Sequence, residues 1–237
     1  TPIQRNITYS DAVQMIQKNS SDVFGTGKRK LFLTRFKGSF LKKCPGISPG
    51  MVCCNYYVVN LLKNCIYDCS YCFLQDFLHN NPLLVAYVNI EDLMGELDQV
   101  FRTYPERTFR VGTGELTDSL ALDTVIPYSQ ELIPFFNKQK NAVLELKTKS
   151  NRVENLLQQN SANNVIVSWS LNPQIIIDRE EKGTPSLKQR LEAAHLCANK
   201  GYKIGIHLDP IIIFQDWEEH YHELINSIFK VLSPAQI

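Results

Sequence analysis

The chain has 237 residues, of which 44% are hydrophobic, so it is long enough to bury one sizeable core. Its net charge of +1 excludes a strong overall attraction to nucleic acid, and no apolar run reaches the roughly 18 residues of a membrane span. There is no signal-peptide pattern and the seven cysteines are an odd number, so we expect reduced thiols, a cytoplasmic location and no membrane partner.

Residues 1–50 are predicted to form a small N-terminal segment or subdomain, irregular apart from a short helix near Asp11 to Lys18. The stretch from Val23 to Tyr67 contains eight Lys and Arg residues, interleaved phenylalanines and no Asp or Glu. Lysine and arginine can neutralise phosphates and aromatic rings can stack on bases, so nucleic acid is one candidate partner. The alternative is a solvated basic face whose phenylalanines pack inward.

From residue 51 onward, predicted strands alternate with predicted helices. The strands are expected at 56–62, 83–89, 108–112, 142–147, 164–171 and 202–208, and the helices at 90–101, 125–138, 153–159, 186–201 and 217–232. This alternation favours a parallel sheet with helical crossovers, hence an α/β fold for residues 51–237. A closed eight-unit barrel needs about 250 residues, so we expect a partial, open barrel. Another strand could begin where the chain stops, which leaves open whether a last unit is missing.

Three cysteines lie within eight positions of the segment NCIYDCSYCFLQ, at a C-x3-C-x2-C spacing: Cys65, Cys69 and Cys72. Three thiolates on one loop are soft ligands that suit zinc, copper(I) or an iron–sulfur cluster. A structural zinc site takes four ligands, and His79 could supply the fourth. A [4Fe–4S] cluster usually takes four cysteines, so three would leave one iron open. A zinc site or an incidental cysteine loop is the alternative to the cluster.

This cysteine motif, with Tyr71 just before its last cysteine, resembles the radical S-adenosylmethionine (SAM) superfamily. The segments LELKTKS, SWSLN, GTPSL and DPIIIFQDWEEHY are similar to those of the spore photoproduct lyase family. The resemblance implies a partial (β/α)6-type barrel in which Cys65, Cys69 and Cys72 hold a [4Fe–4S] cluster that binds SAM. It also implies reductive cleavage of SAM to a 5′-deoxyadenosyl radical that abstracts a substrate hydrogen. Because the chain shows no nicotinamide or flavin fingerprint, we expect an external one-electron donor such as a flavodoxin or ferredoxin.

The resemblance further assigns seven residues to SAM binding: Tyr71, Gly112, Gly114, Glu115, Lys147, Ser170 and Asn172. The segment GTGE at 112–115 is similar to the superfamily's Gly-Gly-Glu motif, where glycines permit close approach and a carboxylate receives the SAM ammonium. Lys147 would contact the SAM carboxylate or ribose, Ser170 and Asn172 the ribose or methionine part, and Tyr71 the adenine. The alternative is an ordinary turn for GTGE, a surface cation for Lys147, capping of the following turn for Ser170 and Asn172, and core packing for Tyr71.

Further candidates lie outside these motifs. His207 and Asp209, at the end of a predicted strand, either face the substrate or are a structural histidine and a turn-forming Asp-Pro. Cys44, Cys53 and Cys54 either hold an extra cluster or deliver a hydrogen atom, or they are buried packing residues.

One position departs from the family pattern. Spore photoproduct lyases commonly carry a cysteine just after the strand occupied here by RVGTGELTDS, whereas Glu115 or a neighbour stands there, and no cysteine lies between Cys72 and Cys197. The late hydrogen donor is therefore not identified. Three functions stay open: a spore photoproduct lyase-like enzyme acting on nucleic acid, the same radical chemistry on another substrate, and a non-enzymatic iron–sulfur or zinc-binding protein.

Overall fold

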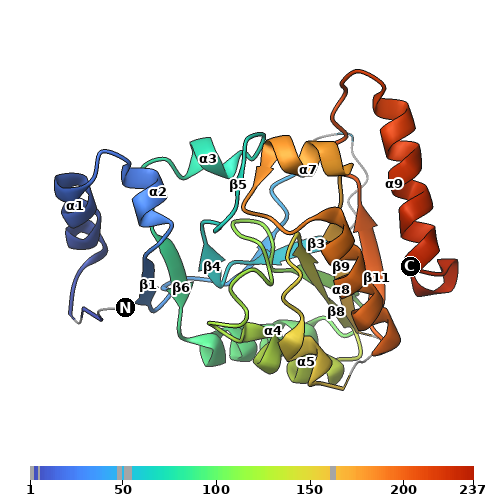
Figure 1. Cartoon of the computed structure of the whole chain (residues 1–237). Coiled ribbons are helices and arrows are strands. Elements are labelled where there is room, and N and C mark those ends of the chain that lie inside the picture. The colour runs from blue at the N-terminus through green and yellow to red at the C-terminus, as the bar shows by residue number, and fades with distance from the viewer. Residues whose placement is uncertain (1–2, 5, 47–49, 51–54, 161–163) are drawn as a thin grey trace.

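The main sheet of this computed structural model, which describes residues 3–4, 6–46, 50, 55–160 and 164–237, has the strand order β11-β9-β8-β7-β3-β2 (Figure 1). Its strands are β2 (Leu41–Lys43), β3 (Tyr56–Val59), β7 (Phe109–Gly112), β8 (Ala142–Thr148), β9 (Val165–Ser170) and β11 (Lys203–His207). All neighbours are parallel except β2, which pairs antiparallel with β3 at one edge. The sheet does not close on itself within the described residues, which confirms the partial, open barrel.

One hydrophobic core lies between this sheet and the long helices. The helices that follow its strands or lead into them are α4 (Ile90–Thr103), α5 (Tyr128–Asn137), α6 (Glu154–Leu157), α7 (Gln174–Glu180), α8 (Leu187–Asn199) and α9 (Trp217–Val231). Helix α4 buries Leu93, Leu97 and Phe101, whose four-residue spacing places them on one face. In the strands, core residues such as Leu144 and Leu146 alternate with residues that point to the opposite face of the sheet.

The N-terminal part of the chain contains more regular structure than its sequence predicts. Helices α1 (Tyr9–Asn19) and α2 (Val23–Gly27) precede β1 (Leu31–Thr34), which belongs to a second sheet of order β1-β6-β4 with β4 (Leu62–Lys63) and β6 (Leu84–Tyr87). Figure 1 shows α1 and α2 at the end of the molecule opposite α9. Strand β2 of the first fifty residues joins the main sheet.

Two strand predictions are therefore corrected. The strand predicted at 83–89 is β6, which pairs parallel with β1 and antiparallel with β4 instead of joining the barrel sheet. The strand predicted at 56–62 divides into β3 and β4, which enter different sheets. All four residues of β6 are buried, and an apolar run reports burial without specifying which sheet provides it.

Three short elements lie in or beside the cysteine loop: β5 (Asp68–Cys69), α3 (Leu74–Phe77) and β10 (Glu181–Lys182). A 3-10 turn, η1 (Pro234–Gln236), follows α9. The carboxyl ends of the parallel strands meet at one edge of the main sheet, where ligand sites of such sheets collect. No helix in the described part of the chain combines the length and apolar character needed to span a membrane.

Candidate functional site

The three predicted cysteine ligands lie together on the loop that follows β4. Cys69 is buried, Cys65 and Cys72 are partly buried, and all three thiols are free. They pack in one small apolar cluster that also includes Tyr67 and Tyr71. The amide of Cys72 donates to the carbonyl of Cys69 at 3.1 Å, so these two cysteines flank one turn of the loop. Three soft thiol donors on one loop fit an iron–sulfur cluster by their chemistry.

The side chains around the cysteine loop are not arranged as a ready metal-ion site. Among the described residues, no group of three or more His, Cys, Asp and Glu side chains, the three cysteines included, could hold a metal ion as placed. His79, the candidate fourth ligand, has its Nδ1 2.6 Å from the carbonyl of Asp76 and its Nε2 2.7 Å from the amide of Asn80. Both of its ring nitrogens therefore have partners outside the cysteine loop.

Burial controls the protonation of two of these thiols, Cys65 and Cys69. It raises the pKa of Cys65 to about 12, with the nearby Asp118 charge adding to the effect. It likewise raises the pKa of Cys69 to about 12. Cys65 and Cys69 are therefore neutral thiols at neutral pH, and a metal cluster must displace their protons to bind them as thiolates.

Two anchors hold the cysteine loop from opposite sides. On one side, Lys28 is 7% exposed, and its Nζ donates to the carbonyl of Tyr67 at 2.5 Å and pairs with Asp68. On the other side, β5 pairs antiparallel with β10, which places Cys69 opposite Glu181. The loop is therefore tied both to the N-terminal helices and to the segment after β9.

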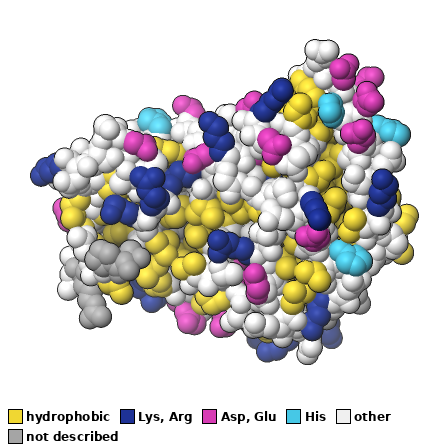
Figure 2. Space-filling view, viewed as in Figure 1, with side chains coloured by type: hydrophobic (Ala, Val, Ile, Leu, Met, Phe, Trp, Pro, Cys, Tyr) yellow, Lys and Arg dark blue, Asp and Glu magenta, His cyan; other side chains and the backbone are white. Residues whose placement is uncertain are grey.

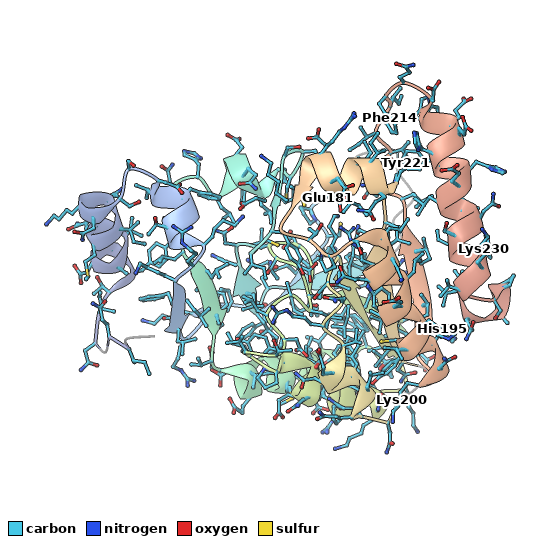
Figure 3. The ribbon with its side chains drawn as sticks, viewed as in Figure 1. Glu181, His195, Lys200, Phe214, Tyr221 and Lys230 are labelled. Atoms are coloured by element: carbon cyan, nitrogen blue, oxygen red, sulfur yellow. The ribbon has the colours of Figure 1, made fainter. Side chains whose placement is uncertain are left out.

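Glu181 is the centre of a buried polar network above the end of β9. Its Oε2 pairs with the guanidinium of Arg190 at 2.5 Å, and its Oε1 accepts hydrogen bonds from Tyr71 and, at 2.9 Å, from Asn172. The amide oxygen of Asn172 in turn accepts from Tyr221 of α9 at 2.7 Å. Figure 3 labels Glu181 and Tyr221 in this region, beside α7 and α9. The network joins the cysteine loop, the end of β9 and α9.

The charges of this network shift the pKa of its members. Burial alone would raise the pKa of Glu181, but Arg190 and Lys149, with the hydrogen bonds from Asn172 and Tyr71, hold it below its usual value. Burial first, and then the Glu181 charge, raise the pKa of Tyr71. The pair is therefore an ionised carboxylate and a neutral phenol.

The GTGE loop at the end of β7 is packed closely. A Cβ at Gly112 would lie 1.7 Å from the Tyr56 hydroxyl, and one at Gly114 would lie 3.3 Å from the carbonyl oxygen of Lys147, so glycine suits both positions. Glu115 is held by Asn60, whose Nδ2 donates to its Oε2 at 2.5 Å.

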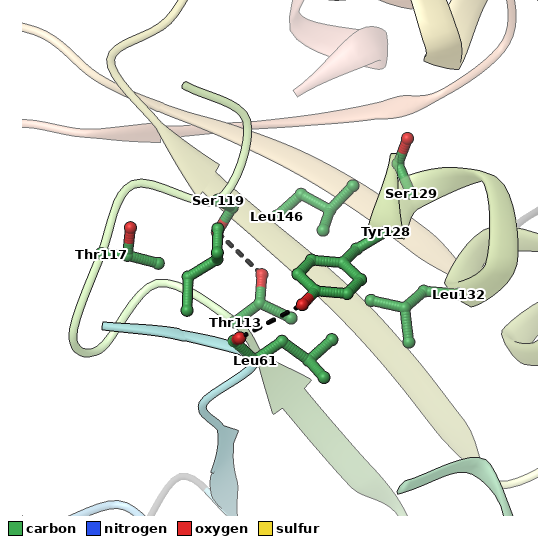
Figure 4. A pocket seen from close by; sticks show the side chains of 9 residues that line it. Leu61, Thr113, Thr117, Ser119, Tyr128, Ser129, Leu132 and Leu146 are labelled. Atoms are coloured by element: carbon green, nitrogen blue, oxygen red, sulfur yellow. Dashed lines mark hydrogen bonds between the residues drawn. The ribbon is translucent and has the colours of Figure 1, made fainter. Parts of the chain in front are cut away.

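Asp118 organises the rest of the β7 loop. Its carboxylate accepts the amides of Leu120 and Ala121 at 3.0 and 2.9 Å, and the Thr148 hydroxyl and Lys149 amide at 2.6 Å each. Behind this loop lies a cavity of about 10 Å³, whose lining includes Thr113 and Tyr128 (Figure 4). That volume suits at most one water molecule, so the cavity is no substrate site.

The two lysines at the end of β8 have different surroundings. Lys147, the residue assigned from the sequence, has its Nζ 3.6 Å from Asp209. Lys149 has its Nζ 5.7 Å from the centre of the Tyr71 ring and 4.0 Å from Glu181. Of the two, Lys149 is the one in contact with the cysteine-loop network.

The remaining predicted residues are distributed over the edge of the sheet. Ser170 is buried, its carbonyl accepts from Arg190 at 3.1 Å, and it pairs in register with His207. His207 Nε2 donates to the ionised carboxylate of Glu145 at 3.0 Å, so it has a structural partner. Cys44 is free and partly exposed, whereas Cys53 and Cys54 lie outside the described residues. Cys197 is fully buried in the core.

A second charged group crosses the face of the sheet that points away from the core. Glu145 of β8 pairs with Arg110 of β7 at 2.7 Å and accepts from Ser168 of β9 at 2.8 Å, while His207 of β11 lies at 3.0 Å. Burial opposes ionisation of Glu145, but His207, Ser168 and Arg110 lower its pKa to about 2. The sequence analysis missed this group, because its members come from four separate strands.

Sequence reasoning also missed Glu181, Arg190 and Lys149. Glu181 stands just before the segment GTPSL, but nothing in the local sequence marks it as buried or as the partner of Tyr71, which is 110 residues away. A charge that is almost fully buried needs a partner, and only the contacts reveal Arg190 as that partner.

Comparison with known protein sequences identifies the family of this chain. A sequence model of the family described as "Spore photoproduct lyase" matches residues 51–236. The spore photoproduct lyase of Bacillus subtilis (strain 168) is 27% identical over 176 residues, which cover 74% of this chain and 52% of the relative. That of Geobacillus sp. (strain Y412MC61) is 28% identical over 181 residues, covering 76% and 53%. This chain thus spans about half the length of the curated relatives that it matches.

Solved structures show the same fold. A spore photoproduct lyase variant with bound AdoMet and dinucleoside spore photoproduct superimposes with a TM-score of 0.81 at 24% identity, over 90% of this chain and 60% of that one. Another variant of the enzyme gives a TM-score of 0.82 at 24% identity, over 91% and 62%. At this level of identity the likeness concerns the fold.

Proposed function

Because this chain belongs to the spore photoproduct lyase family, we propose that it is a radical SAM enzyme whose [4Fe–4S] cluster is held by Cys65, Cys69 and Cys72. The observation that carries the proposal is the gathering of these three free cysteines on one anchored loop, in a chain that matches the family over residues 51–236. When bound, the cluster supplies the electron that cleaves SAM and releases a 5′-deoxyadenosyl radical. The protein's own residues position SAM and shield the site.

The SAM-binding residues of this proposal lie on the cysteine loop and at the ends of β7, β8 and β9: Tyr71, Gly112, Gly114, Glu115, Lys147, Ser170 and Asn172. Lys149 is added, because its ammonium group lies over the ring of Tyr71 and could pair with the SAM carboxylate. Asn172 acts in part indirectly, since both ends of its amide are already bonded to Glu181 and Tyr221.

The proposed substrate class is nucleic acid. One structure of the similar enzyme is named as a complex with dinucleoside spore photoproduct, and the stretch 23–67 of this chain is basic and free of acidic residues. The position after β7 carries Glu115 or a neighbouring residue where the family commonly has a cysteine, so we assign radical generation and hydrogen abstraction but no thiol that returns the hydrogen. A flavodoxin or ferredoxin is the proposed electron donor, and the cytoplasm the proposed location.

Anaerobic reconstitution with iron and sulfide tests the proposal. The reduced protein should show an electron paramagnetic resonance signal that changes when SAM is added, and it should form 5′-deoxyadenosine from SAM. Cys69→Ala should abolish both. Cys44→Ala is the matched control, because Cys44 is a free cysteine outside the loop, and it should retain both.

A protein that retains zinc instead, or a cluster whose signal ignores SAM, would contradict the enzymatic proposal. The cysteine loop would then be a structural or electron-carrying site on the same fold.

A further inference from the structure

Strand β1 is the edge of the second sheet and carries exposed apolar side chains. The sheet order β1-β6-β4 places β6 on one side of β1, and no strand among the described residues lies on its other side, the outer edge. Leu31 is 37% exposed and Leu33 is 58% exposed, whereas Phe32 packs in the small core beneath α1. Alternate residues of a strand point to the same face, so the two leucines lie together on the solvent-facing side.

The backbone groups of β1 that point to the outer edge follow from its pairing with β6. The carbonyls of Lys30 and Thr34 accept amides of β6 and of the residue after it, at 3.2 and 2.9 Å. Because successive carbonyls of a strand point to opposite sides, Leu31 and Leu33 direct their N–H and C=O groups to the outer edge. Within the described part of the chain, no backbone group pairs with them. An edge of this kind is a template on which another strand can add.

Cations flank this edge at both ends of β1. Four exposed residues carry them: Arg29, Lys30, Arg35 and Lys37. Of these four, only Arg35 forms an ion pair with a described residue, namely Asp92 at 2.8 Å. Figure 1 places β1 beside β6 at the end of the molecule that carries α1 and α2, and Figure 2 shows hydrophobic side chains bordered by Lys and Arg on that end.

The charges distinguish between possible occupants of the edge. A second copy of β1 added antiparallel would bring Lys30 opposite Arg35 of that copy, and like charges directly opposite each other are destabilising. Nucleic acid could neutralise the cations, but it offers no regular series of amide donors and carbonyl acceptors to match a strand. An acidic polypeptide in extended conformation satisfies the backbone groups and the cations together.

We propose that β1 is a docking edge for an extended acidic segment of a partner protein, which joins the sheet as an additional strand. The backbone of this segment pairs with Leu31 and Leu33, and its apolar side chains cover the two leucines. Its Asp and Glu residues pair with the cations at the ends of β1. The inference is independent of the proposed radical chemistry, because β1 contributes no residue to the proposed SAM site.

A fluorescein-labelled peptide of alternating Val and Thr, with two Glu residues at each end, is the probe. Fluorescence anisotropy should show that it binds the full chain and that binding weakens as salt is added. A peptide with the same centre and two Lys residues at each end should bind about tenfold more weakly or less. Lys37→Met should reduce the salt dependence, whereas the matched control Lys188→Met on α8, where the side chain is 85% exposed, should bind like the wild type.

Leu33→Pro tests the backbone pairing directly. It removes an N–H that points to the outer edge and leaves the pairing with β6 in place, so the fold should persist. Peptide affinity should fall about tenfold, which corresponds to the loss of one hydrogen bond. Leu33→Thr is the matched control, because it also removes the leucine side chain but keeps the N–H, and it should bind more tightly than Leu33→Pro.

Amide hydrogen exchange measured by NMR provides a second test that needs no variant. The amides of Leu31 and Leu33 should exchange rapidly in the isolated protein and about tenfold more slowly with the peptide bound. The amides of Phe32 and Thr34, which point to β6, should be slow in both states.

Four results would overturn the proposal. The first two are absence of peptide binding by the wild type and binding that leaves the exchange of Leu31 and Leu33 unchanged. The third is Lys37-dependent binding of an oligothymidylate in place of the peptide, which would assign the cations to nucleic acid. The fourth is concentration-dependent dimerisation that protects the same two amides without peptide, which would make a second copy the occupant.

Discussion

Glu181 and Cys69 face each other across a two-stranded antiparallel sheet, so one backbone pairing positions both the buried carboxylate and a cluster cysteine. The side chain of Glu181 then continues to Arg190 and to Tyr71, which lies between Cys69 and Cys72 in sequence. The ion pair between Glu181 and Arg190 thereby helps to hold the cysteine loop in position. Its loss should lower both the free energy of unfolding and the retention of the metal.

Replacing Glu181 by Gln should therefore lower the free energy of unfolding by about 3 kcal/mol or more, because it leaves the guanidinium of Arg190 buried without a countercharge. Chemical denaturation would measure this loss, and iron content after reconstitution should fall with it. Glu223→Gln on α9 is the control, since Glu223 is exposed and its replacement should change stability by about 0.5 kcal/mol or less. Equal stabilities of the two variants would contradict this account.

Glu145 should make stability depend on acid pH. Its pKa is lowered from 4.5 to about 2, so its contribution to stability is complete above about pH 4.5 and is lost as the pH falls toward 2. The shift corresponds to about 3 kcal/mol at neutral pH. Denaturation of the wild type and of Glu145→Gln at several pH values should show a difference that narrows below about pH 4. A difference that stays constant from pH 7 to pH 3 would argue against this role.

Lys28 should restrict access to the cysteine loop. Its ammonium group donates to the carbonyl of Tyr67, and Lys28→Met would leave that carbonyl without this donor at a cost of about 1–3 kcal/mol. We expect faster modification of the loop thiols by a disulfide reagent in the metal-free variant. Lys30→Met, two residues away at an exposed position, should react at the wild-type rate. Unchanged thiol reactivity in Lys28→Met would show that the anchor is dispensable.

The two lysines at the end of β8 can be distinguished by SAM binding. Lys149→Met should weaken equilibrium binding of SAM about tenfold, because this cation lies next to Tyr71 and Glu181. Lys147→Met should have a smaller effect, because Asp209 already partners its ammonium group. Isothermal calorimetry on the anaerobically reconstituted protein would measure both. A larger loss in Lys147→Met would restore the assignment made from the sequence.

Much of the site was predictable because its signals are local. The spacing of Cys65, Cys69 and Cys72 needs only one short loop, and the structure brings these residues together as expected. The strand and helix periods also predicted the order of elements from β7 to α9, except for the short α7 and β10, which they did not predict. Segments that belong to parallel strands end at the same edge of the sheet, which explains why GTGE and SWSLN lie at one edge, on either side of β8.

The sequence by itself therefore determined the α/β class, the cysteine motif and the family, since each is carried by short segments that can be recognised one by one along the chain. Only the tertiary structure decided that β6 leaves the barrel sheet, that Glu181 supports Tyr71, and that Lys149 lies nearer the cysteine loop network than Lys147 does. Those relationships depend on strand partners and on buried polar groups that lie far apart in the sequence, by 110 residues in the case of Tyr71 and Glu181. Hydrophobic periodicity indicates which side chains are buried, but it carries no information about the partner that each buried group finds.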